Sequence, residues 1–320
     1  MPQSRLASAN LPPGANTVSS HKQILRTGVD LCDRYISPNS KQLADNIGLT
    51  PLLDKLYFTK KNLDGVAPGN TLERVSARQD FLECQLQAVQ LLQKTQLEID
   101  FVEAEIDAEQ NLYAELLTTL EQDRDRLVAR TNAASFYTNG ALWAAAEGLT
   151  IPTFRYSNYA IPSGITGIVA GVIPSFFSLW AMRQYSGKKS KTIHEPNMLA
   201  KVFDYPTTPE IEYPKSVWEY LNSRPYDQAG KRLMEKTRRD QLIETWIEDK
   251  NIPTFTDRSS KKQLDIITAS GEVKDGLNID TLNTRDIMLE QLQGEVGKMK
   301  RLLMELVMVV HGDKQFIVDR

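Results

Sequence analysis

The chain is poor in cysteine and histidine, with two and three of them in 320 residues. Two isolated thiols, Cys32 and Cys84, do not imply a disulfide framework, and the second falls inside a predicted helix, where a small buried thiol is common. The three histidines are far apart in the sequence and have no neighbours of metal-ligand type. We therefore predict neither a disulfide scaffold nor a metal site.

Motifs of the common enzyme classes are also absent. The sequence contains no HExxH, no paired CxxC, no GxSxG and no glycine-rich phosphate loop ending in Lys-Ser or Lys-Thr. The glycines of the stretch SGITGIVAGV lie in an apolar run and not in a strand-to-helix loop. We expect a non-enzymatic protein with no catalytic residues, no metal and no cofactor.

Basic charge is not in excess, because the net charge is -3 and the pI is near 5.8. A chain-wide nucleic-acid surface needs a basic excess, so no nucleic-acid partner is predicted. The mean hydropathy of -0.37 excludes a multi-span transporter. The start lacks the apolar core of a secretory signal, so export by that route is not expected. Pro12, Pro13 and Gly14 break any amphipathic helix there, which indicates a flexible tail over 1–20, followed by short helices over 21–69.

Neither glycine nor proline occurs between Asn70 and Asn139, which predicts a long helix over 70–131 with Asn70 or Thr71 as its N-cap. A heptad register tested from position 89 to 127 is apolar at eight of twelve places. The pattern is typical of packing along one face, against another part of the chain or a second copy. The eight are Val89, Leu92, Ile99, Ile106, Tyr113, Leu117, Leu120 and Leu127.

The same helix carries a dense acidic stretch, with ten acids against one base between Thr95 and Asp125. Such a stretch can bind cations or recognise a basic partner. A solvated helix face is the favoured interpretation, because no oxygen-rich loop with a central glycine accompanies the acids. The ten are Glu98, Asp100, Glu103, Glu105, Asp107, Glu109, Glu115, Glu121, Asp123 and Asp125.

Charge is missing altogether between Tyr156 and Met182. The segment 161–182 is long enough to cross a hydrocarbon core of roughly 30 Å as a helix. The preceding segment, 132–154, is alanine-rich, and both segments carry small residues every fourth position. We predict that 132–182 forms a transmembrane hairpin packed through these residues. They are Gly140, Ala144 and Gly148 in the first span and Ser163, Gly167, Gly171 and Ser175 in the second.

Glu147 is the one ionisable residue in this predicted membrane segment, which makes it a candidate for a polar path or a cross-helix pair. Seven bases flank the hairpin and one lies in its turn, so both termini are expected on the cytoplasmic, matrix or stromal side. Lys188, Lys189 and Lys191 are expected to contact anionic lipid heads. These features predict an integral membrane protein. The alternative is a buried core hairpin of a soluble protein.

The C-terminal part divides into a basic, then proline- and aromatic-rich segment over 183–226, a small helical region with a possible strand pair over 227–283, and a coiled-coil helix over 284–312. Every position of one seam in the last helix is apolar, with 3, 4 spacing. This helix either builds a homo-oligomer or packs on the acidic helix. The seam residues are Leu289, Leu292, Val296, Met299, Leu303, Leu306 and Val310.

The predicted fold is mainly α: a long coiled-coil-like helix leading into a two-helix transmembrane hairpin, then a partly irregular helical region that ends in a short coiled coil. The corresponding function is a membrane-anchored scaffold or tether that contacts membrane lipids, self-associates and recruits an unidentified protein partner. One alternative is an ion-conducting pore, because the order of elements is similar to that of calcium uniporter pore subunits, although the acidic Trp-Asp signature of that family is missing. Another is an α-helical pore-forming toxin.

Overall fold

The structure, a computed structural model, describes residues 27–69, 71–153, 196–227, 231–254, 258–268 and 277–316. Within these ranges the protein is helical and has no strand, only two isolated bridges. The predicted mainly α class is therefore confirmed. The elements are α1 (Pro38–Asn46), α2 (Thr50–Gly65), α3 (Leu72–Thr153), α5 (Met198–Val202), the 3-10 turn η2 (Pro209–Ile211), α6 (Lys215–Asn222), α7 (Arg238–Glu248), α8 (Arg258–Ile267) and α9 (Ile279–His311).

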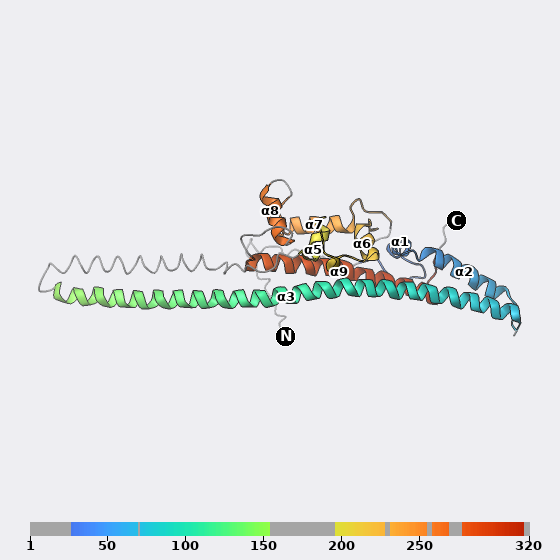
Figure 1. Cartoon of the computed structure of the whole chain (residues 1–320), viewed down its shortest axis with the longest axis horizontal. Coiled ribbons are helices and arrows are strands. Elements are labelled where there is room, and N and C mark those ends of the chain that lie inside the picture. Colours follow the sequence, from blue (N-terminus) through green and yellow to red (C-terminus); the bar gives the residue numbers. More distant parts are fainter. Residues whose placement is uncertain are drawn as a thin grey trace, which may run out of the picture.

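Helix α3 dominates the molecule, with 82 residues in one continuous element, or roughly 120 Å at 1.5 Å per residue (Figure 1). It begins as predicted, because the Arg74 N–H donates to the Thr71 hydroxyl oxygen at 3.3 Å. The helix continues without a break past 131, where the predicted acidic helix gives way to the first predicted span. An isolated glycine weakens a helix by about 1 kcal/mol without breaking it, so α3 runs through Gly140 and Gly148.

Helix α9 runs antiparallel to α3 along the N-terminal half of α3 (Figure 1). Polar contacts at the edge of the interface fix this direction. Lys300 forms an ion pair with Asp100 at 2.8 Å. Further along α3 and further back along α9, the Gln110 amide donates to the Asp286 carboxylate at 3.1 Å. The two patterned helices of the sequence thus pair with each other.

The seven seam residues of α9 are no more than 3% exposed within the single chain. They pack with the buried face of α3, which includes Ile99, Val102 and Ile106. Packing on the acidic helix, one of the two predicted alternatives, is what the structure shows. The other alternative, self-association through this seam, is corrected: side chains buried inside one chain cannot contact a second copy without opening the fold.

The remaining helices complete the core around α9. Helix α2 folds back on the start of α3, where the Cys84 thiol contacts the Leu52 carbonyl at 3.4 Å. Helices α1, α5, α6, α7 and α8 pack around α9 (Figure 1), and α5 and α6 also contact α3. Beyond residue 120, α3 extends past all the other described helices (Figure 1). The folded unit therefore has a compact part and a long helical arm.

The ends of the C-terminal elements are set by capping. Helix α9 starts earlier than at the predicted caps, Thr281 or Asn283, because the Asn278 side chain accepts from the Thr281 N–H at 2.7 Å. It ends at Gly312, as predicted, in the left-handed conformation with φ of 88°. The predicted first strand of the pair in 227–283 is wrong, since residues up to Ile267 form α8.

No helix among the described residues is long and apolar enough to span a membrane. This finding contradicts the predicted integral membrane protein. The first predicted span is the last part of α3, where alanines and polar residues keep the hydropathy low. The second predicted span, with Ser163, Gly167, Gly171 and Ser175, and the predicted lipid contacts Lys188, Lys189 and Lys191 lie outside the described residues.

Candidate interaction surface

Helix α3 has apolar residues on two faces. One face is buried against α2 and α9. At about 100° per residue, a second row of apolar side chains lies roughly opposite the first, and its members are 37% to 86% exposed. We call this row the outer stripe. It consists of Leu72, Val75, Leu82, Leu86, Val89, Leu97, Phe101 and Leu112.

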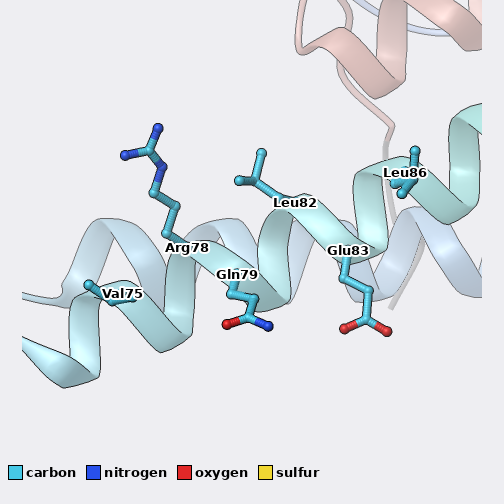
Figure 2. A pocket seen from close by; sticks show the side chains of 6 residues that line it. All are labelled: Val75, Arg78, Gln79, Leu82, Glu83 and Leu86. Carbon is cyan, nitrogen blue, oxygen red and sulfur yellow. The ribbon is translucent and has the colours of Figure 1, made fainter.

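The N-terminal part of the outer stripe forms a shallow hollow lined only by α3 side chains (Figure 2). Arg78 and Leu82 project to one side of the row, and Gln79 and Glu83 project to the other (Figure 2). An isolated exposed leucine is ordinary on a protein surface, but a continuous row of them indicates a contact site. Its apolar lining, Val75, Leu82 and Leu86, suits contact with the side chains of another helix.

The arm of α3 adds a separate group of exposed aromatic side chains, Phe136, Tyr137 and Trp143. The Phe136 and Tyr137 rings meet edge to face with their centroids 6.2 Å apart. Aromatic side chains are enriched where proteins bind one another. The arm is thus a second candidate contact region, distinct from the outer stripe.

The predicted hairpin residues of the first span lie on this arm. Glu147 is exposed, as are Gly140, Ala144 and Gly148. A Cβ placed on either glycine would have no atom within 4 Å, so the described residues show no close helix contact there. The structure brings none of these four residues to a buried site, and Glu147 does not line a polar path among the described residues.

The acidic stretch is only partly a solvated face, because half of its acids contact other elements. Lys300 of α9 binds both Asp100 and Glu103. Further polar contacts join Glu98 to Ser216, Asp107 to Gln293 and Glu109 to the Met198 N–H. Among the described residues no group of three His, Cys, Asp or Glu is placed to hold a metal ion. These acids help to fix the register of the core.

Glu109 lies at a buried junction of α3, α5 and α9. One carboxylate oxygen accepts from the Met198 N–H at 2.8 Å, and the other has no partner among the described residues. The nearby Arg285 guanidinium donates to the Ile266 carbonyl and lies 5.3 Å from the centre of the Tyr113 ring. Burial raises the Glu109 pKa to about 7, against the Met198 hydrogen bond and Arg285, which lower it.

This pKa predicts how stability depends on pH. A carboxyl whose pKa is higher in the folded state stabilises the protein at low pH, and that contribution is lost as pH rises from about 4.5 through about 7. We expect the unfolding free energy of the native protein, relative to Glu109→Gln, to fall by about 2–3 kcal/mol between pH 5 and pH 8. Urea unfolding at several pH values measures this. The exposed Glu115→Gln is the control, and parallel curves for all three proteins would contradict the prediction.

A second buried polar cluster joins the two ends of the described chain. Glu305 and Lys314 are 0% and 3% exposed and form an ion pair at 2.6 Å. The same carboxylate accepts from the hydroxyls of Ser37 and Ser40, both at 2.6 Å, and Lys314 donates to the Tyr35 carbonyl. Every group of this cluster is satisfied within the protein. The cluster therefore holds the segment at Ser37 and Ser40 against the end of α9.

The sequence interpretation missed the outer stripe, although its signal is present. A heptad register that starts at position 89 leaves out most of the exposed seam, which begins at Leu72 and includes Val75, Leu82 and Leu86. A second register on the same helix would have revealed it. Periodicity alone would still not have shown which of the two apolar faces is covered.

The surface and the fold define a helical protein organised along one long helix. No family model, no curated protein and no solved structure matches the chain.

Proposed function

We propose that the protein is a non-enzymatic helical scaffold or tether that self-associates and recruits a protein partner. The observation that carries this proposal is the outer stripe: α3 buries one apolar face in the fold and exposes another over about 40 residues from Leu72 to Leu112. Exposing so many apolar side chains is unfavourable in water, which supports a role in contacting another helix.

The shape of the molecule supports the same proposal. Among the described helices, only the first half of α3 packs in the compact part, and the other end of α3 lies far from it (Figure 1). A long helix separates two attachment points by a fixed distance. The aromatic group around Tyr137 then offers an attachment point on the arm, while the outer stripe offers one beside the core. The pore alternatives depended on membrane-spanning helices and are not carried forward.

Recruitment of a protein partner is tested by substitutions in the C-terminal half of the outer stripe. We expect the full chain, purified from its native cells, to bind a defined protein at a fixed molar ratio of partner to chain. Leu97→Glu together with Phe101→Glu should reduce that ratio at least about ten-fold, because charged side chains replace apolar contacts. Quantitative mass spectrometry followed by reconstitution from purified components measures it. Asp80→Lys, an exposed charge change off the stripe, is the control.

Both side chains in the double variant are substantially exposed, so the fold is expected to survive, and circular dichroism checks this. Retention of the partner by the double variant, or the lack of any partner in the native protein at a fixed ratio, would contradict recruitment through the outer stripe.

A further inference from the structure

We infer that two copies of this chain pair through the N-terminal part of the outer stripe, as a parallel, in-register, two-stranded coiled coil over residues 72–89. This inference rests on the proposed scaffold function, because it names the surface and the geometry of self-association. It also assigns self-association to α3 instead of to the seam of α9, because the structure buries that seam within one chain.

Heptad spacing is the first argument. Counting from Leu72 as an a position, the a and d positions fall at 72, 75, 79, 82, 86 and 89. Five of these six residues are apolar and exposed, and Gln79 is the exception. One polar residue at an a position is a known means of fixing register and favouring two strands. The seam therefore has the composition of a dimer contact.

Charge complementarity identifies the occupant as a second copy and sets its direction. Arg78 precedes an a position and Glu83 follows a d position, so they are at g and e and border the row on opposite sides (Figure 2). In a parallel pair, g contacts the partner's e position five residues later, which matches Arg78 with Glu83 of the second copy, twice by symmetry. In an antiparallel pair centred on the same seam, g positions face g and e positions face e, so Arg78 would face Gln85, Glu83 would face Ser76, and the ion pair would be lost.

The helix is already formed before it pairs. Helix α2 packs against this part of α3, and the Cys84 thiol on the covered face contacts the Leu52 carbonyl. Short coiled coils are usually weak because pairing must also order the helices. Here the fold of each chain already orders this helix, so a contact of about two and a half heptads is sufficient for association.

The seam has a defined end. The next a and d positions after Val89 are Gln93 and Gln96, both polar, so the heptad pattern stops there. The exposed apolar row continues at Leu97 and Phe101 in a different register. Self-association is thus confined to 72–89, and the remaining outer stripe is left for the partner of the proposed function.

The mass of the purified full chain tests the pairing. Light scattering over a range of concentrations is expected to approach twice the 36.2 kDa of one chain. Arg78→Glu alone and Glu83→Arg alone should each raise the dimer dissociation constant about ten-fold, because each places like charges across the seam. Combining both changes in one chain should restore the native constant. A monomer at all concentrations, including one in which another segment covers the stripe, would overturn the inference.

Disulfide crosslinking tests the direction. In a Cys32→Ser background, which removes the exposed native thiol, Leu82→Cys places two thiols directly opposite each other when the helices are parallel and in register, whereas in the antiparallel pair centred on the seam position 82 is opposite position 79. Oxidation is expected to yield a covalent dimer. Asp80→Cys, exposed but off the seam, is the matched control and should stay monomeric on a denaturing gel. Equal crosslinking at both positions, or none at Leu82→Cys, would overturn the parallel geometry.

These outcomes separate the inference from the proposed function. A monomer that still loses its partner on substitution at Leu97 and Phe101 would refute the coiled coil and leave recruitment intact. A dimer that crosslinks at position 82 but recruits no partner would support the coiled coil and refute recruitment.

Discussion

Glu305→Ala is expected to lower the free energy of unfolding by about 3–5 kcal/mol, the largest effect of any single exchange among the buried polar residues. The substitution leaves the Lys314 ammonium, which is 3% exposed, without its carboxylate. It also removes the acceptor of the Ser37 and Ser40 hydroxyls. Chemical denaturation followed by circular dichroism measures the change.

A double-mutant cycle separates the ion pair from the cost of an unpaired charge. The cycle compares Glu305→Met, Lys314→Met and the variant with both replacements, and removing the two charges together should leave the protein more stable than either single replacement does. The exposed ion pair of Lys236 with Glu244 is the matched control, and Glu244→Ala there is expected to cost less than about 1 kcal/mol. A similar small effect at Glu305 would show that water reaches the cluster.

Leu292→Ala is expected to destabilise the single chain by about 2–5 kcal/mol, because it opens a cavity between α9 and α3. The side chain is fully buried in the interface between the two helices. Ile287→Ala on the same helix is the matched control. Its side chain is 42% exposed, and the expected loss is below about 1 kcal/mol. Denaturant midpoints of the two variants, measured together, give the difference.

This substitution also distinguishes the two roles predicted for the α9 seam. If the seam packs inside one chain, Leu292→Ala shifts the unfolding transition and leaves the dimer mass of the folded protein unchanged. Loss of the dimer with an unchanged unfolding transition would instead show that the α9 seam forms the contact between two copies.

Several elements follow from the sequence because local signals and packing agree. The start of α3 is set by the Thr71 cap, and the end of α9 is set by Gly312, where only a residue without a Cβ adopts φ of 88° without strain. The 3, 4 spacing of Leu289 to Val310 correctly identified a buried seam. These features depend on a few consecutive turns of helix, which the sequence contains in full.

The predictions that are wrong are those that infer a lipid environment from amino-acid composition. The alanine-rich segment 132–154 was predicted to lie in lipid, whereas its described residues continue α3, and no described helix has the hydropathy to span a membrane. Alanine favours a helix in water as strongly as it permits one in a bilayer, so helix propensity could not separate the two. Glu147 accordingly lies exposed on the arm.

By itself, the sequence determined that this protein is helical, that one helix is very long and that two of its helices carry apolar seams. Only the tertiary structure decided which seam meets which. A heptad pattern specifies that a face will be buried but says nothing about its partner, because any apolar face of matching length satisfies it. The α9 seam packs on one face of α3, with the contacts of Asp100 and Glu103 to Lys300 at its edge, and the opposite face, from Leu72 to Leu112, stays exposed.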